Sequence, residues 1–346
     1  MAVTMVIMIG GNIMKMHGCK TLLVILAAVL CLLSAGGAIS GKISAPVEAS
    51  AGTAEADGPA EAAGVVGSAV SNESAVPVLS CRYYNEREFL KSVNGVAAPA
   101  SNISNEAGET RDVTIKGGIV PHHLLAGRMI ASFFRDLAQD PPGTVILLGP
   151  NHKLAGTSEV HTSSADWKTA FGTLEADGEL AKVLADRMNA SENNRLMEDE
   201  HSISSLIPYI EYYMPDTKIV PVLLYGNYTQ KQSKELGALL AEIVTERPDT
   251  VIVASIDFSH YLDVVTADRM DEMTLAAISS RDLDELSRMS NDNLDSVPSV
   301  ITLLTAMDSI GAGEIDVTGH NNSSRIAGSS KDYTTSYYTM FFRKSD

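Results

Sequence analysis

Cysteine is scarce in this chain, which limits the cross-links and metal sites that the chain can build. The 346 residues include three cysteines, Cys19, Cys31 and Cys81, and the first two lie in or beside an apolar N-terminal segment. If that segment is removed, Cys81 has no intrachain partner, so a disulfide framework is excluded. A cysteine-based zinc site is excluded as well. Any metal must therefore be bound by histidine and carboxylate side chains.

Basic residues are also few. Lysine and arginine number 26 against 43 aspartates and glutamates, which gives a net charge of −17. A nucleic-acid binder needs a basic surface to neutralise phosphates, so we expect no nucleic-acid partner. The acidity suits a well-solvated, soluble surface. The apolar fraction of 45% is enough for a substantial core.

The N-terminus has the layout of a targeting segment. Lys15 and Lys20 precede an apolar run over residues 21–34, and small residues follow at 35–38. This layout predicts a secretory signal peptide over residues 1–39. An uncleaved N-terminal membrane anchor is the alternative, because the run to Ile39 is just long enough to span a bilayer. In both cases we expect an exported, extracytoplasmic protein, secreted or tethered, that contacts a membrane only through this segment.

Residues 40–77 and 78–346 differ sharply in composition. The first stretch is rich in Ala, Gly, Ser, Val and Glu and has no aromatic residue, which predicts a disordered linker. In the second stretch, apolar runs indicate strands at 78–84, 115–120, 144–149, 218–224, 250–255, 314–318 and 333–342. Helical periodicity indicates helices at 86–93, 124–138, 177–188, 199–214, 230–245, 266–279, 283–289 and 296–310. The alternation predicts one layered α/β/α domain with a central, mostly parallel or mixed sheet.

Three of the predicted strands lead into histidines. The segment 115–120 leads into His122 and His123, the segment 144–149 into His152, and the segment 250–255 into Asp257 and His260. In open α/β sheets, ligands bind outside the carboxyl ends of the strands. A single histidine there would be interpreted as structural, but three at equivalent strand ends favour a site.

A metal ion is the ligand that this pattern favours. Neighbouring strands lie about 5 Å apart, so His122 and His152 can reach one ion. Imidazole and carboxylate ligands suit Fe(II), Zn or Cu, and two histidines with one carboxylate are typical of non-haem Fe(II) enzymes. We expect a divalent metal, with Fe(II) preferred and Cu or Zn as alternatives.

Three further residues are candidates for proton transfer. A tight turn would bring Asp257 and His260 together, so that the carboxylate tunes His260 as an acid or base. The alternative is that Asp257 caps the following turn or helix. His201, at the expected start of a helix, is either a pocket acid or base or a helix-terminal residue with a local hydrogen bond. His161 sits within a strand, and His320 precedes a turn signal at the pocket rim.

The combined motifs resemble the MEMO family, also called AmmeMemoRadiSam system protein B. The matching segments are 119–122 (IVPH), 148–152 (LGPNH), 200–203 (EHSI) and 255–261 (SIDFSHY), with 82–84 (RYY) and 333–342 as the expected beginning and end. The resemblance covers residues 78–343. Each motif is weak alone, and their shared order makes the match specific.

The resemblance implies a fold related to class III extradiol dioxygenases, whose iron is bound by two histidines and a glutamate. Under it, His122 and His152 match the metal-binding histidines, and His201 and His260 line the same pocket. Either His201 or His260 matches the acid–base histidine of the dioxygenases. The family commonly has a metal-binding cysteine just before the helix predicted at 296–310, and that position is Asp295 here. The metal set implied is therefore His122, His152 and Asp295.

Two other departures from the family concern the pocket and the N-terminus. The family's Pro-His-Ala-Gly-Tyr segment reads PHHLL over residues 121–125, which changes the pocket floor. Most relatives lack the expected export segment. The first function that we expect is a metal-dependent redox enzyme, dioxygenase-like, acting on an unknown small molecule. The alternatives are a non-catalytic metal-binding module with a protein partner, and a hydrolase that uses a metal-activated water.

Overall fold

The computed structural model describes residues 4–9, 12–17, 76–96, 113–329 and 333–345, within two compact units, Met1–Val70 and Ser71–Asp346. In the first unit, β1 (Thr4–Ile9) pairs antiparallel with β2 (Asn12–His17). The predicted apolar run at 21–34 and nearly all of the predicted linker lie outside the described residues. No helix in the described ranges is long and apolar enough to cross a membrane. The signal peptide and the anchor stay predictions, because the apolar segment that would form them lies outside the described residues.

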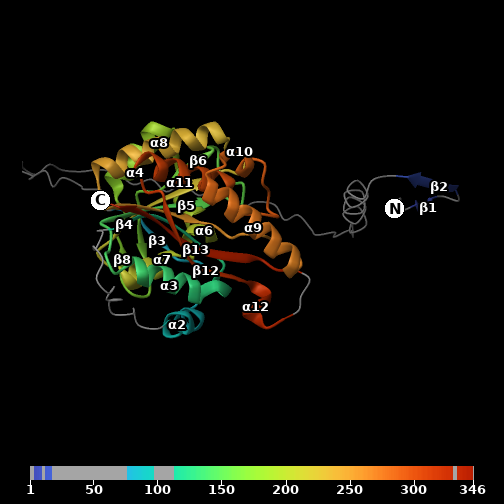
Figure 1. The fold of residues 1–346 in the computed structure, drawn as a ribbon, viewed down its shortest axis with the longest axis horizontal. Coiled ribbons are helices and arrows are strands. Elements are labelled where there is room, and N and C mark those ends of the chain that lie inside the picture. Colours follow the sequence, from blue (N-terminus) through green and yellow to red (C-terminus); the bar gives the residue numbers. More distant parts are fainter. Residues whose placement is uncertain (1–3, 10–11, 18–75, 97–112, 330–332, 346) are drawn as a thin grey trace, which may run out of the picture. The chain divides into compact units, whose positions relative to one another are not determined.

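An eight-stranded mixed sheet forms the centre of the second unit (Figure 1). Four neighbouring strands run parallel, in the order β4 (Val113–Val120), β11 (Thr250–Ser255), β5 (Thr144–Pro150) and β10 (Lys218–Leu224). Beyond β4, β13 (Ser336–Ser345) pairs antiparallel with β4, and β12 (Glu314–Asn322) pairs antiparallel with β13. Beyond β10, β6 (Val160–Thr162) pairs antiparallel with β10, and β9 (Ser191–Glu192) pairs parallel with β6. A separate small sheet contains β3 (Val78–Ser80), β7 (Asp166–Lys168) and β8 (Thr173–Leu174).

The central strands bury both of their faces, which explains their nearly continuous apolar sequences. In β5, Ile146 and Leu148 belong to one hydrophobic cluster, and Val145 and Leu147 belong to the other. This is the period of two expected when successive side chains point to opposite faces of a sheet.

Helices cover both faces of the sheet (Figure 1). The cluster that includes Ile146 is completed by α4 (Gly178–Met188), α8 (Gln230–Glu246), α9 (Val264–Ser280), α10 (Leu283–Leu286) and α11 (Val297–Ser309). The other cluster is completed by α2 (Glu86–Asn94), α3 (Gly127–Leu137), α5 (Asn194–Asp199), α6 (His201–Ser204) and α7 (Ile207–Tyr213). Two further short helices are η1 (Leu124–Ala126) and α12 (Ser323–Ala327). The predicted α/β/α architecture with a mixed sheet is confirmed.

Several predicted boundaries are wrong, for local reasons. The helix expected over 199–214 divides into α6 and α7, because Pro208 lies in the first turn of α7, where a missing N–H is tolerated. The preceding α5, capped by Asn193, was not predicted. The turn expected after His320 is absent, since β12 pairs with β13 as far as Asn322.

The register aligns the carboxyl ends of the parallel strands. Leu148 of β5 is paired with Ala254 of β11, and Val120 of β4 with Ser255. The segments that follow β4, β5 and β11 therefore leave the sheet at one edge, and these segments include the predicted site residues.

Candidate metal centre

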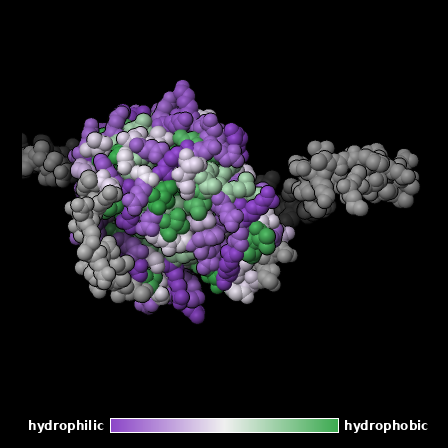
Figure 2. Space-filling model, in the orientation of Figure 1, coloured by the Kyte–Doolittle hydropathy of each residue, from purple (hydrophilic) through white to green (hydrophobic). Residues whose placement is uncertain are grey.

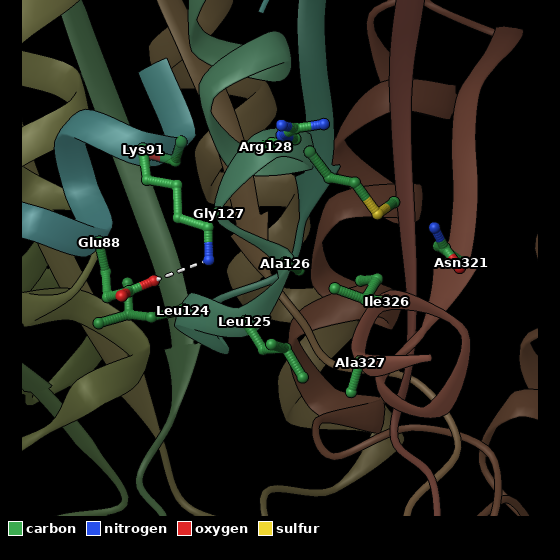
Figure 3. Close-up of a pocket in the computed structure, with 12 residues that line it drawn as sticks. Glu88, Lys91, Leu124, Leu125, Ala126, Gly127, Arg128, Asn321, Ile326 and Ala327 are labelled. Atoms are coloured by element: carbon green, nitrogen blue, oxygen red, sulfur yellow. Dashed lines mark ion pairs between the residues drawn. The ribbon is translucent and has the colours of Figure 1, made fainter. Parts of the chain in front are cut away.

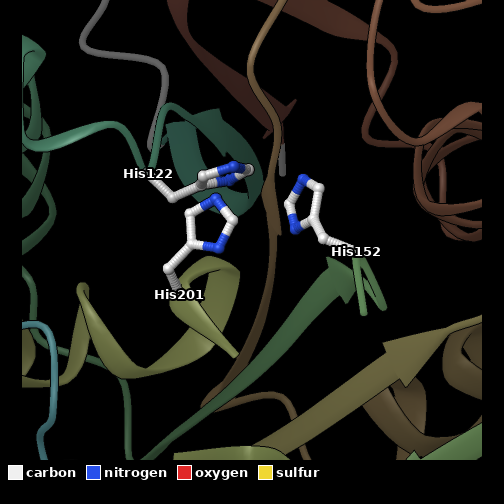
Figure 4. A group of neighbouring side chains, drawn as sticks. All are labelled: His122, His152 and His201. Carbon is white, nitrogen blue, oxygen red and sulfur yellow. The ribbon is translucent and has the colours of Figure 1, made fainter. Parts of the chain in front are cut away.

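Three histidines meet at this edge of the sheet. His122 follows β4, His152 follows β5, and His201 is the first residue of α6. Their ring centroids lie 5.1 Å (His122 to His152), 4.9 Å (His122 to His201) and 4.3 Å (His152 to His201) apart. Figure 4 shows the three rings turned toward one another, and one ring nitrogen from each lies within 4.8 Å of the others.

The proton position on His122 follows from its neighbours. Nδ1 of this buried ring lies 3.0 Å from Oγ of Ser255, and Ser255 donates its hydroxyl proton to the carbonyl oxygen of Ser202 at 2.5 Å. A serine hydroxyl has one proton, so Ser255 must accept from Nδ1–H of His122. Nε2 of His122 then presents its lone pair to the centre, which is the tautomer that a metal ligand requires.

Glu200 orients the other two rings. The side chain of this buried residue accepts from Nδ1 of His152 and from the backbone N–H of His152, each at 2.9 Å. The same carboxylate lies 3.1 Å from Nδ1 of His201. Burial alone would raise the pKa of Glu200, but the hydrogen bonds from His152 and His201 outweigh it and hold that pKa well below its usual range.

Asp295 lies between two of the histidines. Its Oδ2 is 3.3 Å from Nε2 of His122 and 3.4 Å from Nε2 of His152. Two ligands of one tetrahedral ion lie about 3.3 Å apart when each bond is about 2.0–2.1 Å, so these separations suit a shared ion. The other oxygen, Oδ1, is buried and has no hydrogen-bond partner. The residues present therefore fit a divalent metal.

Electrostatics at the centre favour a cation. Burial lowers the pKa of His152, but Asp295 and Glu200 outweigh it and raise that pKa to about 10. Burial likewise opposes protonation of His122, and Asp257 and Asp295 raise its pKa overall. Nitrogen lone pairs that face a carboxylate need a positive charge between them, and either a proton or a metal ion supplies it.

Asp257 has a different role from the one predicted. Its Oδ1 accepts from the backbone N–H groups of His122 at 3.1 Å and His123 at 3.4 Å, and its Oδ2 lies 3.6 Å from Nε2 of His122. No contact between Asp257 and His260 is found in the described part of the chain. The expected pairing of these residues is therefore wrong, and so is the expected capping of the next turn, because the carboxylate fixes the end of β4 instead. With His122 and Asp295, Asp257 forms a second candidate group of ligands.

His260 and His123 lie outside the candidate ligand groups. The backbone N–H of His260 donates to the carbonyl oxygen of Asn291 at 3.0 Å, and its buried Nδ1 has no hydrogen-bond partner. Nδ1 of His123 lies 3.1 Å from the hydroxyl of Tyr337. Burial lowers the pKa of His123.

His320 belongs to a separate group. Its Nε2 lies 2.8 Å from Oδ2 of Asp271, and with Asp268 these residues could also enclose an ion. However, Asp268 is paired with Arg325, and Oδ1 of Asp271 accepts from two serine hydroxyls. These contacts already satisfy the carboxylates. His161 is buried in β6 and joins none of the groups found among the described residues.

Sequence reasoning missed the residues that support the ligands. Glu200 was part of a motif but had no predicted role, and Ser255 was counted only as the last residue of a strand. Ser205 was not singled out, although its hydroxyl lies 3.1 Å from the carbonyl oxygen of His122. The one available signal was at Ser255, where a polar residue ends an apolar strand.

The cavities do not coincide with the histidine cluster. A cavity of about 640 Å³ lies between α2, η1 and α12, with Lys91, Leu125 and Ile326 in its wall (Figure 3). None of the candidate ligands lines it. A second cavity, of about 500 Å³, includes Asp295 in its lining. Proximity to Asp295 makes the smaller cavity the more relevant one.

Comparisons with known proteins agree with the sequence motifs. A family model described as Memo-like protein matches residues 86–341. A MEMO1 family protein of Pyrobaculum aerophilum is 30% identical over 234 residues, covering 65% of this chain and 83% of the relative. A MEMO1 family protein of Methanopyrus kandleri is 27% identical over 249 residues, covering 68% of this chain and 87% of the relative.

Among solved structures, an uncharacterized protein from Escherichia coli K12 aligns with a TM-score of 0.45 and 12% identity, over 65% of this chain and 99% of that chain. The family model extends from α2 into β13, which is well over half of the chain, and the resemblance predicted from sequence is thereby confirmed. The chain belongs to the Memo-like protein family.

Proposed function

We propose that this protein is a metal-dependent enzyme with a non-haem Fe(II) site, or a copper site, that carries out redox chemistry on a small molecule. His122, His152 and Asp295 would hold the metal. The observation that carries the proposal is the position of Oδ2 of Asp295, 3.3 Å and 3.4 Å from two Nε2 atoms. The Nδ1 atom of each ring contacts a separate acceptor, Ser255 or Glu200.

The ligand types support the choice of metal. Two imidazoles and one carboxylate that leave open positions are the set found in non-haem Fe(II) oxygenases. When bound, such an ion supplies one-electron chemistry and open positions for dioxygen and substrate. The side chain of His152 is 29% exposed and that of His201 is 36% exposed, so small molecules can approach the ligands from this side.

His201 is suited to move a proton beside the metal. Its ring stacks on His152, and its Nδ1 lies 3.1 Å from the carboxylate of Glu200. A carboxylate at this distance fixes the orientation of the ring, as an acid–base residue requires. Asp257 would act as a positioning residue, because its oxygen accepts from the backbone of His122. We assign His260 to the pocket wall.

One observation favours a second candidate function. The nearest ring nitrogens of His122, His152 and His201 are all within 4.8 Å of one another, so His201 can join as a fourth ligand. A closed set of three histidines and one carboxylate has no open position in a tetrahedral zinc site. Such a site would suit a metal-binding module that acts through a protein partner.

Elemental analysis tests the proposal. We expect the full chain, purified without chelator and loaded with ferrous iron without oxygen, to retain near-stoichiometric iron. Asp295→Ala and the double variant His122→Ala/His152→Ala should lose it, and His320→Ala should retain it as a control outside the site. Iron retained equally by Asp295→Ala would contradict the proposed ligand set.

Oxygen uptake separates the two candidates. Ferrous iron-dependent oxygen consumption that is stimulated by a small-molecule extract and lost in His201→Ala would support the enzyme. Tight zinc binding that weakens in His201→Ala, without any oxygen uptake, would support the closed metal-binding module.

A further inference from the structure

A cleft of about 500 Å³ opens beside Asp295 at the carboxyl edge of the sheet. One wall is the segment 226–230 between β10 and α8, and the other contains residues from 287 to 301, from the end of α10 into α11. Sites for small molecules usually have volumes of about 300–1,000 Å³. The cleft is therefore large enough for one such ligand.

The first wall of the cleft runs beside the loop of His152. The backbone N–H of Asn151 donates to the carbonyl oxygen of Leu224 at 2.9 Å, and the hydroxyl of Tyr225 donates to the carbonyl oxygen of Leu154 at 3.1 Å. These bonds hold the start of the 226–230 segment against the chain that follows β5. A ligand in the cleft is thus adjacent to the metal centre.

Asp295 belongs to both the metal centre and the cleft. Its Oδ2 faces the two histidines, whereas its Oδ1 is buried and has no hydrogen-bond partner. An unpaired buried acceptor is unfavourable, and the hydroxyl group of a ligand would supply the missing donor. Because this unpaired oxygen also fits the metal centre, the cavity beside Asp295 is the observation that carries the proposal.

The lining is nearly free of charge. Asp295 is the one residue among those lining the cleft that is charged at neutral pH. Neutral polar side chains, such as Asn227, Thr229 and Asn291, form part of the wall, and Leu294 and Ile301 provide apolar surface.

The cationic side chains next to the lining in the sequence, Lys231 and Arg288, are each paired with a glutamate, Glu235 and Glu285. The side chain of Gln230 donates to Asp284 at 2.8 Å, and Gln232, in the first turn of α8, donates to Glu159 at 2.6 Å. The N-terminus of α8 is also engaged, because Thr229 and Gln232 form a reciprocal capping box. An anion would find no cationic partner in the lining, so the cleft selects against acidic ligands.

We propose that this cleft binds the substrate of the metal centre, and that the substrate is a neutral molecule with an apolar face and at least one hydroxyl group. This inference rests on the proposed function, since it takes Asp295 as a metal ligand. The apolar face packs against Leu294 and Ile301, and the hydroxyl group donates to Oδ1 of Asp295.

Gly226 allows the cleft to be filled without disturbing the fold. A Cβ atom built at Gly226 meets no heavy atom within 4 Å, and its φ is outside the left-handed region, so a side chain can begin at this lining position without a clash, and Gly226→Trp is the variant chosen to fill the cleft. Gly313 has the same properties and does not line the cleft, which makes Gly313→Trp a matched control. Asn227→Trp is a second cleft variant if Gly226→Trp does not fold.

The experiment uses saturation-transfer NMR on the full, metal-loaded chain with benzyl alcohol and benzoate as probes of similar size and different charge. We expect a signal from benzyl alcohol that is lost in Gly226→Trp and unchanged in Gly313→Trp, with benzoate giving little signal. An unchanged benzyl alcohol signal in Gly226→Trp, or a stronger signal from benzoate than from the alcohol, would overturn the proposal.

Metal content, measured on the same samples, separates this proposal from the proposed function. If the chain takes up metal but shows no cleft-dependent binding, the cleft proposal fails and the metal centre stands. If benzyl alcohol binds in the expected pattern while the chain takes up no metal, the ligand class of the cleft is supported and the proposed function fails.

Discussion

Oγ of Ser255 lies 3.0 Å from Nδ1 of His122, and the same hydroxyl donates to the carbonyl oxygen of Ser202. This relationship fixes Nδ1 of His122 as a proton donor and leaves Nε2 as a ligand atom. A group that orients a metal ligand in this way contributes strongly to affinity, although it does not contact the ion.

Replacing Ser255 with alanine should therefore weaken metal binding. We expect Ser255→Ala to lower the affinity by about 10–100-fold, the usual range for residues that support a ligand. Titration calorimetry with Fe(II) or Zn(II) under nitrogen measures the affinity of each variant. Ser233→Ala is the matched control, because Ser233 is also a buried serine but its hydroxyl has no hydrogen-bond partner. Equal affinities in the two variants would show that the orientation of His122 does not depend on Ser255.

Glu200 should matter for a related reason, because its carboxylate contacts both His152 and His201. Glu200→Gln leaves one acceptor oxygen and adds an N–H₂ donor that cannot accept from a ring N–H. We expect the metal affinity to fall by about 10–100-fold. Glu211→Gln is a control at another buried glutamate, one whose pKa is raised by burial. Normal affinity in Glu200→Gln would mean that the carboxylate serves only to cap α6, where it accepts from the backbone N–H of Ser202 at 3.3 Å.

The residues that orient the metal ligands were harder to predict from the sequence than the ligands themselves. The strand ends at Val120 and Ser255 could be predicted, and the end of β5 to within one residue, because apolar runs end there. The meeting of His122 with His152 was predicted, but the expected reason was wrong: β4 and β5 are not neighbours, because β11 lies between them, and the two histidines meet across this strand. The contact between Ser255 and His122 depends on the register of β4 against β11, which no local pattern encodes.

The same limit applies to Asp257 and Asp295. The sequence left open a pairing of Asp257 with His260 through a tight turn or capping of the next turn, whereas the carboxylate accepts from backbone N–H groups at the end of β4. The position of Asp295 came from the family resemblance rather than from periodicity. Its contact with two histidines joins residues distant in the sequence, so the family resemblance could imply it but no local pattern could.

The apparent affinity for metal should increase as the pH rises. Hydrogen bonds to Asp295 and Glu200 outweigh burial and raise the pKa of His152 to about 10, so the metal-free site holds a proton throughout the neutral range. The metal must displace that proton, and the apparent affinity should rise with pH up to about pH 10, by about tenfold per unit for each proton released. Calorimetry in buffers of different ionisation enthalpy measures the released protons. Zn(II) affinity that stays constant between pH 6 and 8 would contradict this prediction.

Cys81 should be a poor nucleophile in the folded protein. Burial first, and then the charges of Glu198 and Glu211, raise the pKa of its thiol to about 12, so little thiolate exists at pH 8. We expect iodoacetamide to label the peptide that contains Cys81 slowly in the native protein and completely in denaturant, as followed by mass spectrometry. Rapid native labelling, equal to that of a free cysteine peptide, would show that the thiol is exposed and ionised.

Gly149, in β5, should be intolerant of a side chain because of its contact with α6. A Cβ atom at this position would lie 2.7 Å from Oγ and 3.0 Å from Cβ of Ser202, and both residues are buried. The Oγ of Ser202 is itself fixed by donating to the carbonyl oxygen of Pro150 at 2.8 Å, so it cannot move without losing that bond.

We therefore expect Gly149→Ala to destabilise the protein by about 1–3 kcal/mol, as overpacking of a filled core does. It should also displace α6 from β5, and with it His201 from His152, so metal affinity should fall together with thermal stability. Denaturant unfolding and metal titration of the same samples measure both effects. Gly226→Ala is the control, since a Cβ atom there meets nothing within 4 Å. A loss of stability with unchanged metal affinity would mean that the position of His201 does not depend on the packing of α6 against Gly149.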